Sequence, residues 1–252
     1  MLQTNLSNVG AVIMAAGIGK RLGCTDTPKV MLDIGGQPIV SYVVETLERL
    51  GFTPEQIILV VGFKKEQVQE YFKDRVSYAV QEEQKGTAHA AMTGMQSLPE
   101  SVTQVLVMGG DDGAFYSEDS VLDFITEHVE KKMMLSLLTA EVGEPESFGR
   151  VVRHEDGNIE VIEKEYTTPE QKEIKEVSTG TFCFDREWFQ DMYPTMQPLR
   201  KLGEYGLPTA LAVARDEKRP HQVVLLKDSG EWFGVNTKEQ LERADKKKTE
   251  LK

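Results

Sequence analysis

The sequence predicts an α/β protein with a doubly wound, mostly parallel, Rossmann-like sheet and a smaller β-rich portion behind it. Short runs of β-forming residues alternate with amphipathic helical patterns over residues 1–142, which is typical of a parallel sheet with helices on both faces. After Gly143 this alternation gives way to a hairpin pattern and shorter elements. We expect a single domain over residues 1–252, with its two halves meeting near residue 143.

The sequence of the first half predicts five strands separated by four helices. Residues 9–16 are an apolar run of strand length, too short to span a membrane. A helix opens at Gln37-Pro38 and ends at Gly51, because apolar residues between these points recur at helical spacing. Residues 57–61 are continuously apolar, which suits a strand covered on both faces. The remaining elements are helices at 64–72, 86–98 and 117–131 and strands at 76–80, 104–108 and 133–142.

The second half, residues 143–252, shows shorter and more varied elements. Residues 148–165 read as a hairpin that turns at Asp156-Gly157. A short exposed helix, a strand and an aromatic-rich helix are expected at 168–175, 176–184 and 186–193. A helix, a strand and a closing helix complete the chain at 207–217, 222–227 and 237–248.

Composition places the chain among globular proteins and excludes two classes of partner. Hydrophobic residues make up 40% and charged residues 28% of the 252 residues, so the chain can bury a large core. The net charge of −12 argues against a nucleic-acid-binding surface, which requires a basic face. No segment has membrane length, and the two cysteines, Cys24 and Cys183, lack metal-like spacing. We therefore expect a reduced, cytoplasmic protein without a nucleic-acid or membrane partner.

The first loop is the strongest candidate for a binding site. The strand at residues 9–16 breaks into Gly17-Ile18-Gly19-Lys20-Arg21, and Lys29 follows Pro28 a few residues later. Glycines let backbone N–H groups approach a phosphate closely, and the basic side chains supply positive charge in an otherwise acidic chain. The interpretation is that this loop holds a nucleoside triphosphate whose nucleotidyl group is transferred to another phosphate. The alternative is an ordinary strand-to-helix turn with solvated basic residues.

Two better-known phosphate-binding loops do not fit this stretch. A P-loop requires Gly-Lys-Ser/Thr, but Gly19-Lys20 is followed by Arg21. A dinucleotide fingerprint requires a third glycine where this chain has Leu22.

The loop is part of a longer ordered set of motifs. The set contains Ala15-Ala16-Gly17-x-Gly-x-Arg21, Pro28-Lys29-Val30, Gln81 to Ala90, Gly110-Asp111, Phe148-Gly149-Arg150-Val151, Glu163-Lys164, Thr179-Gly180, Gly203-Glu204-Tyr205 and Gly234-Val235-Asn236. In this order the motifs resemble those of the sugar-phosphate nucleotidyltransferases. The resemblance is greatest to the pyrophosphorylase domain of bacterial N-acetylglucosamine-1-phosphate uridylyltransferases, and it covers residues 9–245.

The resemblance implies how the reacting phosphates are held. Arg21 would contact the triphosphate and Lys29 the α-phosphate and the departing phosphates. Two polyanions also require a divalent cation, and hard oxygen ligands suit Mg²⁺. Asp111 follows a strand at the edge where ligands of open α/β sheets collect, and Asn236 matches the second metal ligand of the family. Asp112 is a departure from the family pattern, so either aspartate could bind the metal, although alignment favours Asp111. An alternative is that the two aspartates only form a turn or cap a helix.

The base and the nucleoside are expected to lie against two further segments. A glutamine amide offers one acceptor and two donors, so Gln81 could complement the N3–H and O4 edge of uracil. The resemblance implies that Gln81 and the backbone of Gly86-Thr87 read the base. It also implies that the backbone of Ala15, Ala16 and Gly17 lines the nucleoside and that Gly19 belongs to the nucleotide loop. His89 is interpreted as a surface or packing residue of its helix.

The sugar side of the predicted site departs more from the family. Gly149, Glu163 and Thr179 match positions that hold the sugar in the family, while Ser178 stands where an asparagine is usual. Gly109 replaces a common aromatic residue, and Asp112-Gly113-Ala114 replaces a proline-bearing turn. The chain ends at Lys252 without hexapeptide repeats, so no left-handed β-helix acetyltransferase domain is expected.

The sequence therefore predicts a magnesium-dependent enzyme that makes a UDP-sugar and pyrophosphate from UTP and a sugar 1-phosphate. UDP-N-acetylglucosamine or a similar UDP-hexose is the expected product. The alternatives are a nucleotidyltransferase that uses GTP or CTP, or another acceptor, and a non-catalytic regulatory protein that binds a nucleotide sugar. The sequence leaves the oligomeric state open.

Overall fold

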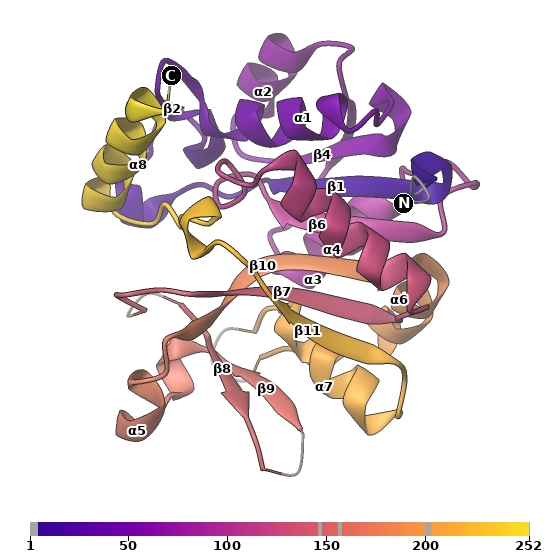
Figure 1. Cartoon of the computed structure of the whole chain (residues 1–252). Coiled ribbons are helices and arrows are strands. Elements are labelled where there is room, and N and C mark those ends of the chain that lie inside the picture. The colour runs from indigo at the N-terminus through magenta and orange to yellow at the C-terminus, as the bar shows by residue number, and fades with distance from the viewer. Residues whose placement is uncertain (1–4, 146–147, 156–157, 200–202, 252) are drawn as a thin grey trace.

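The structure is a computed structural model that describes residues 5–145, 148–155, 158–199 and 203–251. Its main sheet has nine strands among these residues, and the order along its main path is β11-β7-β10-β6-β1-β4-β5 (Figure 1). The strands of this path are β1 (Val9–Ala15), β4 (Ile57–Val61), β5 (Ser77–Val80), β6 (Gln104–Gly109), β7 (Leu135–Glu141), β10 (Glu176–Asp185) and β11 (His221–Leu225). Two further strands, β8 (Arg150–Arg153) and β9 (Ile159–Ile162), extend from β10, and β2 (Asp33–Ile34) pairs separately with β3 (Gln37–Pro38).

Eight α-helices connect and cover these strands in the described part of the chain. They are α1 (Ile39–Arg49), α2 (Lys65–Phe72), α3 (Thr87–Met95), α4 (Glu118–Glu130), α5 (Pro169–Lys172), α6 (Arg186–Met192), α7 (Pro208–Asp216) and α8 (Lys238–Glu250). None of the helices in the described residues is long and apolar enough to cross a membrane.

The sheet is doubly wound because alternate side chains of its central strands enter two different cores. In β4, Ile57, Leu59 and Val61 pack with apolar residues of α1, α2 and α4. Ile58 and Val60 point the other way and pack with α3, α6 and α7. All five β4 residues are buried, which confirms the prediction of a strand covered on both faces.

One strand of the second half lies within the parallel sheet. β10 pairs antiparallel with β6 on one side and with β7 on the other, so it separates two strands that the first half supplies. Every other strand of the main path runs in one direction. The predicted class, a mostly parallel α/β sheet, is therefore confirmed, while the insertion of β10 is a long-range pairing that local patterns do not reveal.

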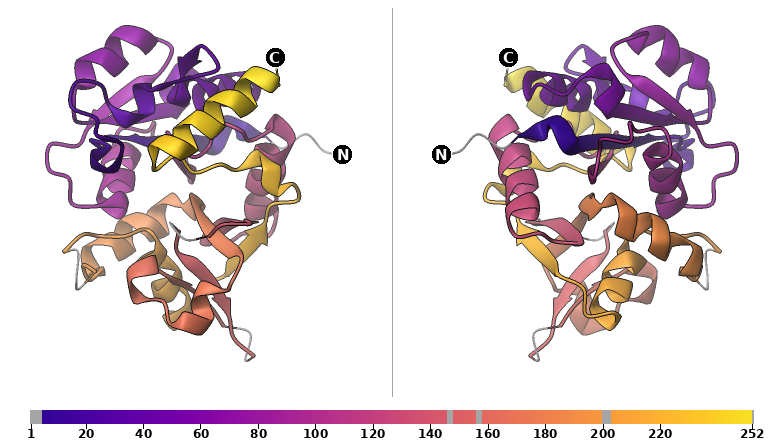
Figure 2. Two further views of the ribbon diagram at one scale, coloured as in Figure 1. Left: turned by 90° about the vertical axis from the view of Figure 1, so that its left-hand side faces the viewer. Right: turned by 90° about the vertical axis from the view of Figure 1, so that its right-hand side faces the viewer.

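The C-terminal helix returns to the N-terminal part of the chain. Figure 2 shows α8 lying across the β2–β3 hairpin, and Figure 1 shows it beside β2. Ala244 of α8 is fully buried in an apolar cluster with Ile34 and Ile39. The Asp245 carboxylate accepts a 2.7 Å hydrogen bond from the Gly35 backbone N–H. These contacts hold the residues that precede α8 close to the first loop.

The structure differs from the sequence prediction at the start of α1 and does not describe the predicted turn between β8 and β9. Gln37 and Pro38 form β3 instead of the first turn of a helix, and α1 begins at Ile39, because these two residues pair with Asp33 and Ile34. β8 and β9 form the predicted hairpin, but its expected turn at Asp156-Gly157 lies outside the described residues.

Candidate active site

A cleft of about 490 Å³ opens where β1 and β6 end. Sixteen residues line it, and they come from segments that are far apart in the sequence. They are Met14, Ala16, Gly17, Arg21, Lys29, Val30, Gln81, Gln84, Gly86, Thr87, Ala90, Gly109, Asp111, Asp112, Gly180 and Glu204. Eight of the predicted site residues are among them: Ala16, Gly17, Arg21, Lys29, Gln81, Gly86, Thr87 and Asp111.

The first loop is longer and more structured than an ordinary strand-to-helix turn. After β1 the chain makes two 3-10 turns, Lys20–Leu22 and Lys29–Met31, and the β2–β3 hairpin before α1 begins. Gly19 has a φ of +78°, and a Cβ atom there would come within 2.8 Å of the Lys29 Cβ. A Cβ atom on Gly17 would meet nothing within 4 Å. Gly19 therefore lets the loop fold onto Lys29, whereas Gly17 leaves open space at the cleft.

Four polar side chains form one cluster at this cleft: Arg21, Lys29 and Asp111 line it, and Asn236 contacts two of them. The Lys29 ammonium forms an ion pair with the Asp111 carboxylate and donates a 3.1 Å hydrogen bond to Asn236 Oδ1. Arg21 Nη2 donates a 3.0 Å hydrogen bond to the same Asn236 oxygen. Arg21 and Asn236 are 215 positions apart in the chain. The fold thus brings together both predicted phosphate-binding cations and both predicted metal ligands.

Two pKa values are shifted at this cluster, that of Lys29 and that of the neighbouring Asp112. Burial alone would lower the pKa of Lys29, but the negative charges of Asp111 and Asp112 outweigh it and raise this pKa. Burial raises the pKa of Asp112 to about 7, and the neighbouring Asp111 charge adds to the shift. Lys29 therefore stays protonated at neutral pH, and Asp112 ionises less readily than an ordinary carboxyl group.

The oxygen atoms of this cluster fit a hard divalent cation. Asp111 offers a carboxylate and Asn236 an amide oxygen, and both are turned toward one positive group, the Lys29 ammonium. Asp112 adds a carboxylate oxygen, Oδ1, that is buried and has no hydrogen-bond partner among the residues that the structure describes. Within the described residues there is no group of three or more His, Cys, Asp and Glu side chains that could hold a metal by themselves. A cation here would therefore rely on substrate or water oxygens as well, as Mg²⁺ commonly does.

The predicted base-reading residues lie at the other end of the cleft. Gln81 follows β5, and its side chain is buried, with 5% of the residue exposed. Gly86 has a φ of +104°, and a Cβ atom there would come within 2.6 Å of the Tyr205 carbonyl oxygen. The Thr87 hydroxyl accepts a 2.9 Å hydrogen bond from the Leu207 N–H. Ala15 lies deeper, and its side chain belongs to the core.

Three of the four predicted sugar-binding residues lie close together where β8, β9 and β10 meet. The Ser178 N–H donates to the Gly149 carbonyl oxygen at 3.1 Å, and a Cβ atom on Gly149 would lie 3.5 Å from Glu163 Oε2. Burial raises the pKa of Glu163, and the Glu165 charge adds to this effect. Thr179 faces the opposite way: it is 1% exposed, and its hydroxyl donates to the Leu138 carbonyl oxygen at 2.7 Å. None of these four residues lines the 490 Å³ cleft.

Several cleft-lining residues were not assigned roles from the sequence, among them Gln84, Gly180 and Glu204. Gln84 donates a 2.7 Å hydrogen bond to the Ala16 carbonyl oxygen and thereby ties the base end to the first loop. Gly180 lies at an irregularity of β10 between Ser178 and Thr181. Glu204 lies beside Gly86. Gln84, Gly180 and Glu204 all belong to motifs that the family resemblance rests on, so the sequence could have marked them as candidate site residues. That they line one cleft is shown only by the structure.

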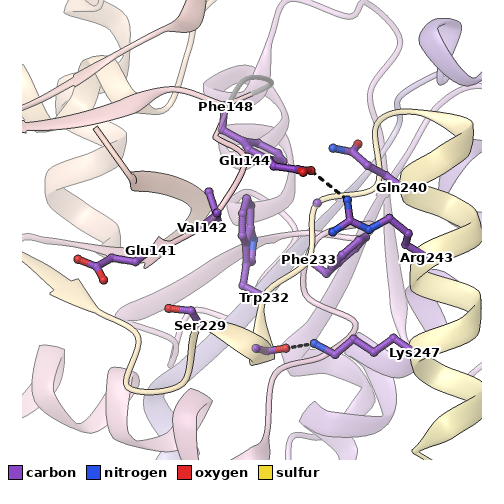
Figure 3. Close-up of a pocket in the computed structure, with 13 residues that line it drawn as sticks. Glu141, Val142, Glu144, Phe148, Ser229, Trp232, Phe233, Gln240, Arg243 and Lys247 are labelled. Atoms are coloured by element: carbon purple, nitrogen blue, oxygen red, sulfur yellow. Dashed lines mark hydrogen bonds and ion pairs between the residues drawn. The ribbon is translucent and has the colours of Figure 1, made fainter. Parts of the chain in front are cut away.

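A second cavity of about 420 Å³ lies behind the segment that carries Asn236 (Figure 3). The rings of Phe148 and Trp232 meet edge to face on its wall, with their centroids 4.7 Å apart. Gln240 of α8 accepts a 2.7 Å hydrogen bond from the Asn236 N–H. Figure 3 also shows Arg243 of α8 reaching Glu144, an ion pair of 3.2 Å. The walls of this cavity thus hold the backbone of Asn236 in position.

The whole chain matches one protein family. The nucleotidyl transferase family matches residues 10–250, which includes every element of the cleft. The chain therefore belongs to this family. The prediction that it is an enzyme of the sugar-phosphate nucleotidyltransferase type is confirmed.

Within the family the chain is similar to one half of a larger protein. It is 35% identical over 243 residues to the bifunctional protein GlmU of Symbiobacterium thermophilum, which covers 95% of this chain and 51% of that protein. It is also 35% identical over 237 residues to the bifunctional protein GlmU of Heliobacterium modesticaldum, covering 93% of this chain and 51% of that protein. The chain thus spans about half the length of the curated relatives that it matches.

A solved structure shows the same fold. It is a Bacillus anthracis protein, provisionally assigned as a glucose-1-phosphate thymidylyltransferase and crystallised with sucrose. The TM-score is 0.79 at 22% identity, over 97% of this chain and 96% of that one. At this identity the similarity concerns the fold, and it agrees with the predicted fold class.

Proposed function

We propose that the chain transfers the uridylyl group of UTP to a sugar 1-phosphate and releases pyrophosphate. N-acetylglucosamine 1-phosphate or a similar hexose 1-phosphate is the proposed acceptor. The observation that carries this proposal is the cluster in which Lys29 bridges Asp111 and Asn236 while Arg21 shares the Asn236 oxygen. The 35% identity to relatives named bifunctional protein GlmU, over about half of their length, supports this proposal.

The proposed reaction needs alignment and charge more than covalent chemistry. A phosphate oxygen of the sugar 1-phosphate attacks the α-phosphorus of UTP, and the bond from that phosphorus to the bridging oxygen of pyrophosphate breaks. Holding two anions in line lowers the entropic part of the barrier, and fixed positive charge stabilises the transition state. Arg21 and Lys29 provide that charge, and both already lie at the cleft. His89 is not needed as a base, because a phosphate nucleophile is already ionised.

Asp111 and Asn236 are the residues that would hold Mg²⁺ in this proposal. When bound, the ion neutralises phosphate charge and so favours approach of the two anions and departure of pyrophosphate. An oxygen atom of Asp111 and one of Asn236 both contact the Lys29 ammonium, so the two oxygens already face one positive group.

In this proposal, different residues contact the nucleotide and the sugar. Gln81, Gly86 and Thr87 would contact the base, and the backbone of Ala16 and Gly17 the nucleoside. Gly149, Glu163 and Ser178 would contact the sugar, since they meet at one point of the β-rich portion. A reducing, cytoplasmic site of action belongs to this proposal, because both cysteines are free thiols.

The proposal is tested by measuring pyrophosphate release with Mg²⁺. UTP, dTTP, CTP and GTP are each combined with a panel of sugar 1-phosphates, and the product is identified by mass. The expected result is release that requires both UTP and a hexose 1-phosphate, and that is lost in Lys29→Ala but kept in Lys246→Ala, which removes an exposed lysine of α8.

Two results would contradict the proposal. Pyrophosphate release with another triphosphate but not with UTP would show that the nucleotide donor is not UTP. Binding of a UDP-sugar in a calorimeter, without pyrophosphate release under any pairing, would favour a non-catalytic regulatory protein.

A further inference from the structure

The Gln81 amide at the base end of the cleft has both of its N–H groups engaged within the protein. Its Nε2 donates to the Gly86 carbonyl oxygen at 3.2 Å and lies 2.9 Å from His89 Nδ1. A backbone carbonyl can only accept, so the group that faces Gly86 must be the NH₂ and not the oxygen of the amide. The same NH₂ then donates to His89 Nδ1, which must be the unprotonated nitrogen of the ring.

This arrangement leaves the Gln81 Oε1 as the polar atom available to a ligand. Among the described residues this oxygen has no hydrogen-bond partner, although Gln81 is 5% exposed and lines the cleft. Both amide hydrogens are already used by Gly86 and His89. Gln81 can therefore accept a hydrogen bond from a base but has no free N–H with which to donate one.

His89 is held firmly enough to impose this orientation. It lies in the first turn of α3, and the start of that helix is fixed to a distant segment. The Ala88 N–H donates to the Tyr205 carbonyl oxygen, and the Tyr205 N–H donates to the Lys85 carbonyl oxygen, each at 2.8 Å. The His89 ring thus approaches Gln81 from a helix whose start is fixed by hydrogen bonds within the protein. Without His89, one amide hydrogen of Gln81 would become free.

We infer that His89 is a positioning residue for base selection, which acts by making Gln81 a pure hydrogen-bond acceptor. This inference rests on the proposed function and deepens it. Uracil presents an N3–H donor to such an acceptor. At the same position cytosine presents the lone pair of its N3, and its nearest donor, the N4 amino group, lies where uracil has O4. Two acceptors facing each other in a buried site leave both unsatisfied, so the site discriminates against CTP by roughly 10–100-fold.

The inference is tested by calorimetric binding of UTP and of CTP in the presence of Mg²⁺ and without an acceptor. The wild-type chain is compared with His89→Leu, which removes the ring nitrogens, and with His89→Asn, whose amide oxygen can accept in place of Nδ1. Thr93→Ala is the matched control, because Thr93 lies on the same helix and bonds to the His89 carbonyl oxygen, not to its ring.

The wild-type chain is expected to prefer UTP by at least about tenfold, and Thr93→Ala to keep that ratio. His89→Leu should lower the ratio about tenfold, and His89→Asn should restore part of it. An unchanged ratio in His89→Leu would overturn the inference, as would equal binding of UTP and CTP by the wild type. If His89→Leu does not fold, as judged by circular dichroism, His89→Ala decides by the same criterion: a ratio lowered about tenfold supports the inference, and an unchanged ratio overturns it. Absence of any nucleotide binding by the wild type would instead refute the proposed function itself.

Discussion

Replacing Asp112 by asparagine is expected to stabilise the folded chain at alkaline pH but not at acidic pH. Burial and the Asp111 charge raise the pKa of Asp112 from 3.8 to about 7. Its Oδ1 is buried, with no hydrogen-bond partner in the described part of the structure. Between these two pH values the folded chain therefore keeps a proton that the unfolded chain has already released.

The sign and size of the effect follow from this difference. A carboxyl group with a raised pKa makes the folded state less stable as pH rises through that window, because the unfolded chain ionises more easily. A shift of about three pKa units corresponds to roughly 4 kcal/mol at about 1.36 kcal/mol per unit, and this is an upper bound. Since Asp112 lies at a solvated cleft, we expect about 2 kcal/mol from Asp112→Asn at pH 8. In a chain of this size that corresponds to an increase in Tm of about 4–8 °C.

The assay is thermal unfolding, followed by circular dichroism between pH 4 and pH 8 in a chelator, so that no divalent cation screens the carboxylates. Asp191→Asn is the control, because Asp191 is exposed near the end of α6. The difference in Tm between Asp112→Asn and wild type should grow steadily with pH, while that of the control should not. A difference that is the same at pH 4 and pH 8 would show that burial of the Asp112 charge does not govern the stability of this site.

Three further predictions concern the proposed reaction. Lys29→Ala should lower turnover about 10²-fold or more while the circular dichroism spectrum stays unchanged, because one preorganised charge is removed; near-normal turnover would argue against its role. Asp111→Ala should abolish magnesium-dependent turnover although Asp112 remains, whereas an unaltered Mg²⁺ titration would assign the cation to Asp112. Glu163→Gln should raise the KM for the sugar 1-phosphate about tenfold and leave the Kd for UTP unchanged, because Glu163 lies beside Gly149 and away from the nucleotide end; an equal loss for both substrates would contradict the division of the site.

Local patterns predicted most elements of the fold. The bounds of β4 and α4 can be predicted from neighbouring residues. A continuous apolar run defines β4, and an N-cap residue marks the start of α4. The antiparallel entry of β10 between β6 and β7 could not be read in this way. Strand pairing across such distances in the chain depends on which cores the strands complete, and a β-rich run does not encode its partner.

The candidate site was predictable where the signal lies in one stretch. Gly17, Arg21 and Lys29 were identified from a single loop, and the structure gathers them at one cleft. Their chemical roles stay predictions. The contacts of Gln84 with Ala16 and of His89 with Gln81 could not be predicted, because each is a side-chain hydrogen bond that forms only in the folded chain. An amide in a sequence has no orientation, and only the Gly86 carbonyl and the His89 ring give one to Gln81.

The proposed function requires that a chain with a net charge of −12 bind two polyanions, and the contacts of Lys29 suit this requirement. Lys29 is buried against Asp111 and Asn236, so its charge is neutralised locally and costs less to bury than an unpaired ammonium would. The negative charges of Asp111 and Asp112 keep its pKa raised, so the charge is not lost at neutral pH. Lys29 is therefore a preorganised cation, and in the proposed reaction it can turn toward phosphate only when Asp111 has another positive partner. Asp111 thus contributes to the proposed anion site, because it holds the Lys29 ammonium in place before any substrate binds.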